Sequence, residues 1–259
     1  MTKQRPALPA PAVPESTAAP ESTSARKNTA ARENTSAREN TAVPADPGGS
    51  VHASAVSLVG GHPVLDFANT VAWRLDPART ADRVQGPEAW ARWAATAGPA
   101  GQEHAETLLR AAAADPARAE AATAALVDLR TALLPVLDAL VDDAQPPAAQ
   151  WEALRGHLAR ARQDSALPPT FPLRWQPDPD RLDGLRHELA LRTEELLGGD
   201  NLDRVRRCEG AGCGWFFLDR SRNATRRWCS AGDCGNRDRA RRHYARTRRE
   251  ASPAAQAQA

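Results

Sequence analysis

The strongest constraint on this chain comes from its four cysteines, which all lie near the C-terminus. They form two pairs of equal spacing, Cys208/Cys213 and Cys229/Cys234, and fifteen residues separate the pairs. The short spacing lets one tight turn aim two sulfurs at one point, and the gap allows a small hairpin that brings the pairs together. Four thiolates satisfy the tetrahedral preference of Zn²⁺ and leave no open position for water. The sequence therefore predicts one structural Zn²⁺ ligated by Cys208, Cys213, Cys229 and Cys234.

Two other uses of the cysteines stay open, namely two disulfides or four free thiols. Disulfides need an oxidising compartment, and the N-terminal sequence MTKQRPALPAPAVPEST has no continuous apolar segment to direct export. No stretch approaches the roughly 18 continuous apolar residues of a membrane span. We therefore expect a cytoplasmic protein with no membrane partner.

The residues around the cysteines predict a treble-clef-like finger. Glycines allow the tight backbone of a metal knuckle at the first pair. Residues 215–218 are typical of a short strand, with 226–228 as its return. Ser230 is a candidate N-cap for a helix over residues 231–249, which would carry Cys234 in its first turn. With so few apolar residues, this module is expected to unfold without its metal, whereas the rest of the chain would stay folded.

Charge is concentrated in the same region. Residues 201–250 contain fourteen arginines, no lysine and six acidic residues, a formal charge of +8 in a chain whose total is +2. A rotation of about 100° per residue places the helix arginines on two flanks, with Ala240, His243, Tyr244 and Thr247 expected between them, turned toward the zinc core. The predicted nucleic-acid-binding residues are Arg239, Arg242, Arg246 and Arg249 on one flank and Arg237, Arg241 and Arg248 on the other.

Guanidinium groups in this pattern favour a polyanion, through phosphate contacts or bidentate recognition of guanine edges. DNA is the expected partner. An alternative is that the arginines only offset the negative charge of the metal cluster. The arginines placed to do so are Arg206, Arg207, Arg226 and Arg227. This alternative leaves the arginines of the helix unexplained. RNA is the other candidate partner, with Trp215, Phe216 and Trp228 as stacking surfaces.

Two motifs resemble known families. The segment CSAGDCGNRDRARRHY (residues 229–244) and the preceding CGWFFLDRSRNATRRWC resemble the CGNR zinc-finger family. Upstream, GHPVLDFANT (residues 61–70) resembles the G-x-x-x-LDF-x-NT opening of the ABATE domain, which usually precedes this finger. The resemblance covers residues 57–249 and implies a bacterial, largely actinobacterial, stress-related transcription regulator.

The rest of the chain divides by composition. Residues 1–54 contain a polar six-residue repeat (PESTAA, PESTSA, RKNTAA, RENTSA, RENTAV) and are expected to be a disordered arm. Residues 55–200 are expected to fold as a multi-helix domain with a short β element, which makes the fold class mainly α; residues 204–249 form the finger and 250–259 a disordered tail. The expected helices, from apolar periodicity, are 63–73, 87–97, 102–114, 116–143 (kinked or split at Pro135), 147–163 and 180–197.

Three polar residues in the first expected helix form the other candidate site. Asp66, Asn69 and Thr70 are spaced so that they share one helix face. Two roles are open to them. The first is structural, through hydrogen bonds within the domain, and the second is to line a pocket for a small-molecule effector. An enzyme with its active site at Asp66 and Asn69 is a less favoured alternative, because no catalytic motif was found. Since a single finger binds with limited specificity, a homodimer is a further expectation.

Overall fold

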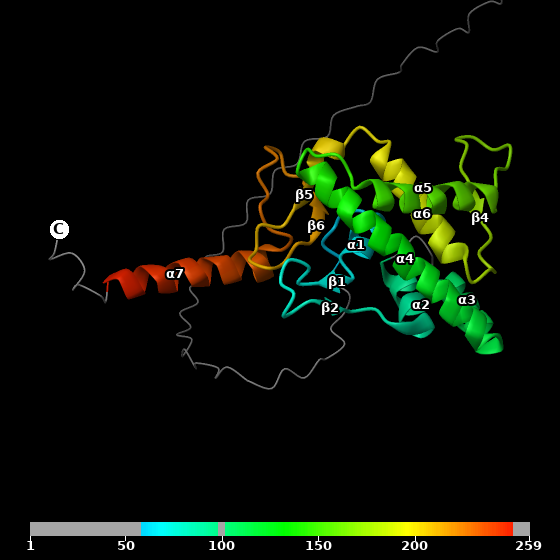
Figure 1. The fold of residues 1–259 in the computed structure, drawn as a ribbon, viewed down its shortest axis with the longest axis horizontal. Coiled ribbons are helices and arrows are strands. Elements are labelled where there is room, and N and C mark those ends of the chain that lie inside the picture. Colours follow the sequence, from blue (N-terminus) through cyan, green and yellow to red (C-terminus); the bar gives the residue numbers. More distant parts are fainter. Residues whose placement is uncertain (1–57, 98–101, 251–259) are drawn as a thin grey trace, which may run out of the picture. The chain divides into compact units, whose positions relative to one another are not determined.

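The computed structural model of the chain describes residues 58–97 and 102–250, so the expected arm and the tail beyond Glu250 lie outside the described residues. The fold is mainly helical, with seven α-helices and three two-stranded antiparallel pairs (Figure 1). This confirms the expected fold class. Among the described residues, no helix combines the length and apolarity needed to cross a membrane.

The longest helix, α4, organises the helical domain and packs against five other helices. The Asp115 side chain accepts a hydrogen bond from the Arg118 N–H, and Pro116 occupies the first turn, as is typical of a helix start. Of the two alternatives expected at Pro135, the split is wrong, because α4 passes through Pro135 as one helix with Leu133 and Leu137 buried on either side. The kink stays a prediction. The helices are α1 (Pro63–Ala68), α2 (Gly86–Thr96), α3 (Gln102–Ala114), α4 (Pro116–Val141), α5 (Ala148–Gln163) and α6 (Gly184–Leu197).

The first helix is shorter than expected. It ends at Ala68 instead of reaching Trp73, and the chain continues into β1 (Val71–Ala72), which pairs with β2 (Ala81–Asp82). The Thr70 hydroxyl donates to the Phe67 carbonyl at 2.7 Å, and this helps to terminate the helix. A second pair, β3 (Ser165–Ala166) with β4 (Gln176–Pro177), flanks the loop that follows α5.

The finger contributes to the core of the helical domain. Its strand pair is β5 (Val205–Arg207) and β6 (Phe216–Leu218), in the register Val205–Leu218 and Arg207–Phe216. Val205 and Phe216 lie in the same buried cluster as the side chains of α1, α2, α4 and α6. Because neighbouring strand residues face opposite sides, Phe217 instead packs against the four cysteines. Strand β6 therefore joins the helical core on one face to the cysteine cluster on the other.

Candidate metal centre and nucleic-acid interface

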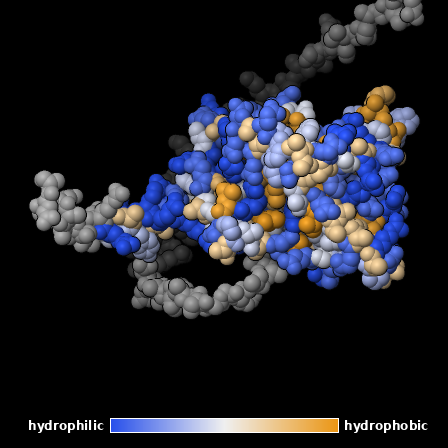
Figure 2. Space-filling model, viewed as in Figure 1, coloured by the Kyte–Doolittle hydropathy of each residue, from blue (hydrophilic) through white to orange (hydrophobic). Residues whose placement is uncertain are grey.

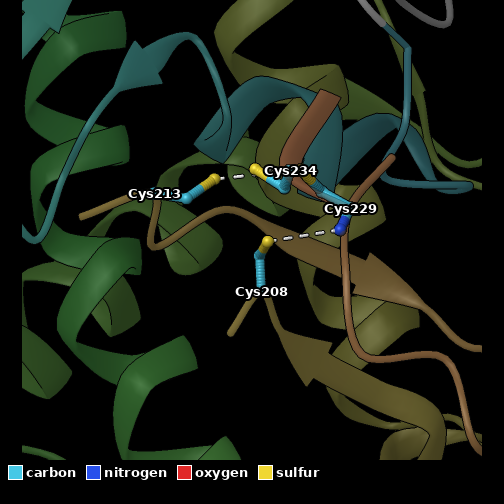
Figure 3. A group of neighbouring side chains, drawn as sticks. All are labelled: Cys208, Cys213, Cys229 and Cys234. Atoms are coloured by element: carbon cyan, nitrogen blue, oxygen red, sulfur yellow. Dashed lines mark hydrogen bonds between the residues drawn. The ribbon is translucent and has the colours of Figure 1, made fainter. Parts of the chain in front are cut away.

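All four cysteines are buried and converge on one point (Figure 3). Their sulfur atoms all lie within 4.8 Å of one another, with Cys213 and Cys229 Sγ 3.8 Å apart and Cys229 and Cys234 Sγ 3.6 Å apart. A tetrahedral ion with Zn–S bonds of about 2.3 Å has sulfurs about 3.8 Å apart. The donor set and the spacing therefore fit one structural Zn²⁺ in a closed site.

The backbone of the first knuckle is adapted to these sulfurs. A Cβ at Gly210 would lie 2.9 Å from the Cys234 Sγ and 3.3 Å from the Cys208 Sγ, so only glycine fits there. The backbone N–H groups of Gly210 and Cys229 donate to Cys208 Sγ at 3.4 Å and 3.3 Å. Hydrogen bonds from Cys213 and Cys229, together with these N–H groups, lower the pKa of the Cys208 thiol, while the same contacts raise the pKa of the Cys213 and Cys229 thiols.

The last ligand is placed by the start of the C-terminal helix. The Ser230 hydroxyl accepts from the Asp233 N–H at 3.2 Å, which confirms the expected N-cap. A single π-helical turn, η2 (Ala231–Gly235), carries Cys234 and leads into α7 (Asn236–Glu250). The expected return strand at 226–228 is wrong, because β6 pairs with β5 on the other side of the knuckle. The Asp219 carboxylate instead accepts from the backbone N–H groups of Ser221 and Arg226 and so holds the intervening loop.

Comparisons with known protein families agree with this geometry. A family model described as "Putative stress-induced transcription regulator" (ABATE) matches residues 61–200. The chain belongs to the ABATE family. A second model, the CGNR zinc finger, matches residues 204–247, so both resemblances seen in the sequence are confirmed. A comparison with curated protein sequences finds no significant match.

The loop between β1 and β2 of the ABATE domain donates hydrogen bonds to the zinc knuckle, the turn around Cys208 and Cys213. The Arg74 N–H donates to the Cys213 carbonyl at 3.1 Å, and the Leu75 N–H donates to the Gly212 carbonyl at 3.2 Å. The Arg74 side chain donates to the Gly214 carbonyl and forms a bidentate pair with Asp138 of α4. One arginine thus links the knuckle, the loop and the longest helix.

Asn69 provides a second link between the ABATE domain and the CGNR finger. Its side-chain amide donates to the Phe216 carbonyl, and its oxygen accepts from the Phe216 N–H, both at 2.8 Å. Thr70 accepts a hydrogen bond from the buried Arg130, and Asp66 accepts one from the Gly60 N–H. The polar atoms of these three residues are therefore engaged inside the protein, which favours the structural one of the two expected roles. That they line an effector pocket stays a prediction.

Asp66 should make the stability of the fold depend on pH. Burial raises the pKa of its carboxyl from 3.8 to about 6. As pH rises from 4 to 6 the unfolded chain loses this proton before the folded chain does, so stability should fall by about 2 kcal/mol. Replacement by asparagine, which can still accept from Gly60, should remove this fall. Urea unfolding of wild type and Asp66→Asn across pH 4–7 measures it, and parallel pH profiles would contradict the assignment.

Three of the four arginines expected to offset the cluster charge, Arg207, Arg226 and Arg227, have other partners. Arg207 forms ion pairs with Asp138 and Asp142 of α4. Arg226 donates to the carbonyls of Val59, Trp228 and Cys229, and Arg227 pairs with Glu209. By contrast, the Arg237 guanidinium donates to Cys234 Sγ at 2.8 Å. Arg237, expected to bind nucleic acid, therefore contacts a metal ligand, a role that its place in the sequence did not reveal.

Helix α7 is exposed around its circumference, and hydrophilic residues cover it in Figure 2. Tyr244 is 70% exposed, and Ala240, His243 and Thr247 are exposed as well. The expectation that these four residues turn toward the zinc core is wrong, because α7 leaves the finger after its first turn. Arg241 and Arg242 both pair with Asp238, Arg239 donates to Asn236, and the exposed side chains of Arg246 and Arg248 lie further along α7.

A wide depression that is open to solvent lies elsewhere in the ABATE domain, between α4 and α5. Its volume is about 620 Å³, and its lining includes Asp128, His157 and the buried Arg186. Small-molecule sites commonly span about 300–1,000 Å³ and combine apolar walls with a few polar groups. The volume of this depression falls within that range, and the binding of an effector stays a prediction.

Proposed function

We propose that this chain is a zinc-dependent, DNA-binding transcription regulator in which α7 contacts the phosphate backbone. The observation that carries the proposal is the exposure of α7. Seven of its fifteen residues are arginines against two acidic residues, and from Arg239 to Arg248 every residue is exposed. A helix with this charge and no apolar face packed on the protein is suited to the dense negative charge of a duplex.

The zinc centre supports this role by fixing where α7 begins. Cys234 is the last ligand and lies in the turn directly before α7, and Arg237 donates to its sulfur. The finger is in turn held by Arg74, Asn69 and Arg207 through contacts to the ABATE domain. The direction of the arginine helix is thus set by the metal and by the ABATE domain together.

The aromatic residues of the finger favour DNA over RNA. Single-stranded RNA is commonly bound by exposed aromatic rings on which bases stack. Phe216 is fully buried. The half-buried Trp215 donates its indole N–H to the Val71 carbonyl, and the Arg227 guanidinium covers the Trp228 ring. These rings are used for packing, so the arginines remain the recognition groups.

The hydrogen bonds of Asp66 and Asn69 to main-chain groups account for both residues without a catalytic role, so we propose a regulator rather than an enzyme.

A homodimer stays a prediction. Exposed apolar side chains gather in the loop between β3 and β4, where Phe171 is 88% and Leu173 56% exposed. Nothing in the structure identifies what covers them.

Replacing Arg242 by alanine should weaken duplex binding about tenfold at low salt and reduce the slope of log K against log[salt] by about one unit. Arg242 is exposed, and Asp238 keeps Arg241 as a partner, so the start of α7 should be unchanged. The measurement is fluorescence anisotropy with a random duplex from 50 to 300 mM salt. Arg118→Ala, an exposed arginine of α4, is the matched control. An Arg242→Ala slope equal to that of the control would exclude direct phosphate contact.

A further inference from the structure

A small pocket lies where the ABATE domain meets the start of the arginine helix. We call it the Trp73 pocket. Trp73 and Arg79 contribute from the loop between β1 and β2, Gly210 and Ala211 from the knuckle, and Arg237 and Arg241 from α7. Its volume is about 130 Å³. The pocket is therefore built by both domains, next to the zinc ligands.

Two guanidinium groups converge on one indole in this pocket. The Arg79 guanidinium carbon lies 3.3 Å from the centre of the Trp73 ring, and that of Arg237 lies 4.9 Å from it. These distances place the two cations at most about 8 Å apart. Stacking on the ring holds each cation in position, but the two cations repel each other. The arrangement concentrates positive charge around a single fixed point.

Neither Arg79 nor Arg237 has a carboxylate partner among the described residues. Arg79 makes no ion pair with any described residue, and Arg237 donates to Cys234 Sγ. Two lining residues carry negative charge, namely Cys234, whose thiolate is a metal ligand, and Asp238, which is shared between Arg241 and Arg242. Convergent guanidinium groups that lack carboxylate partners are the donor set that recognises a phosphate, because their planar forks match its oxygens.

We propose that the Trp73 pocket binds a phosphate group. At about 130 Å³ the pocket is smaller than the roughly 300–1,000 Å³ of common small-molecule sites, so its size suits a small anion such as a phosphate group. The phosphate comes either from the backbone of DNA lying along α7 or from a free phosphate compound. The first source rests on the proposed function, and the second is independent of it.

The site makes the ABATE domain part of the ligand-binding surface. Arg79 lies outside the finger, eight residues after the β1 strand begins at Val71, and its loop holds the zinc knuckle through Arg74 and Leu75. A phosphate bridging Arg79 and Arg237 would tie this loop to the first turn of α7. Binding there would therefore stabilise the orientation of α7 relative to the ABATE domain.

The test uses the full zinc-loaded chain and the variant Arg79→Ala, with Arg118→Ala as the matched control. Zinc content and melting temperature verify that each variant is folded. In the first arm, inorganic phosphate is titrated into protein and binding is followed by calorimetry. In the second, a random duplex is titrated in phosphate-free buffer at several salt concentrations. We expect Arg79→Ala to weaken phosphate binding at least tenfold, to reduce the salt slope for DNA by about one unit, or to do both.

The pattern across the arms distinguishes the two sources. If the slope of log K against log[salt] for DNA binding falls for Arg79→Ala but not for Arg118→Ala, the DNA backbone is the source of the phosphate. A loss confined to the phosphate arm identifies a free phosphate compound. If Arg79→Ala behaves like Arg118→Ala in both arms, the inference is overturned. The proposed function survives that result if Arg242→Ala still lowers the DNA slope, and it fails as well if Arg242→Ala does not.

Discussion

Removal of zinc is expected to unfold the CGNR finger and to lower the melting temperature of the ABATE domain by more than about 10 °C. The sequence alone suggested that the helical domain would be indifferent to the metal. The shared core changes this expectation, because Phe216 is fully buried against the helices and Arg207 pairs with Asp138 and Asp142 of α4.

The size of this effect follows from what the finger gives to the core. Burial of a phenylalanine contributes roughly 1.5–3 kcal/mol, and each of the two Asn69–Phe216 hydrogen bonds about 1 kcal/mol. With the part-buried ion pairs of Arg207, the total is on the order of 5 kcal/mol. At about 2–4 °C per kcal/mol for a chain of this size, the shift exceeds 10 °C.

Calorimetry with and without a chelator measures the shift, and Cys229→Ser reproduces it by mutation. The chelator should produce no further change in Cys229→Ser, which controls for effects of the chelator itself. Two separate transitions, of which the helical one is unmoved by chelation, would show that the finger and the ABATE domain fold independently.

Replacing Asn69 by alanine should destabilise the protein by about 3–5 kcal/mol. Asn69 is 4% exposed and satisfies both main-chain polar groups of Phe216, which is also buried. Alanine would leave a buried N–H and a buried C=O without partners, at about 1–3 kcal/mol each. The midpoint of urea unfolding, followed by circular dichroism, measures the loss.

Asn201→Ala makes the same chemical change at an exposed position whose side chain forms no cap hydrogen bond, and it should leave the midpoint nearly unchanged. Because Asn69 does not bind a cysteine, Asn69→Ala should still contain one zinc per chain under native conditions. Equal stability of the two variants would show that the Asn69–Phe216 pair does not hold the two domains together.

The features that sequence predicted well are local ones. The cysteine set follows from spacing over 27 residues, the N-cap from Ser230, and the main helices from apolar periodicity within each segment. Each depends on residues that are close along the chain, so neighbouring residues carry the whole signal.

The features that sequence missed depend on residues far apart. Asn69 and Phe216 are 147 positions apart in the sequence, and Arg74 and Gly214 are 140 positions apart. No sequence pattern in one segment predicts its contact with the other. The pairing of β6 with β5 instead of 226–228 was equally hidden, since both candidates are short and near the knuckle. The LDF-x-NT motif is the nearest thing to a signal, because its asparagine is the residue that reaches β6.

The inward face expected for α7 was wrong for a physical reason. Ala240, His243, Tyr244 and Thr247 lie on one stripe by helical periodicity, and periodicity indicates burial only where another element is present to cover the stripe. In the described residues, α7 packs chiefly against η2, the π-helical turn directly before it. No other element of the described chain covers the stripe, so it stays exposed between two flanks of charged arginines.

The most direct test of zinc-organised DNA binding is a salt titration of the intact chain against random duplex DNA and single-stranded RNA of equal length, with zinc measured on the same sample. We expect one zinc per chain, a slope of log K against log[salt] for duplex DNA of about −3 to −4 from roughly four phosphate contacts, and weaker binding to RNA. One zinc per chain with no duplex binding, or with RNA preferred, would contradict the proposed function while leaving the metal centre intact.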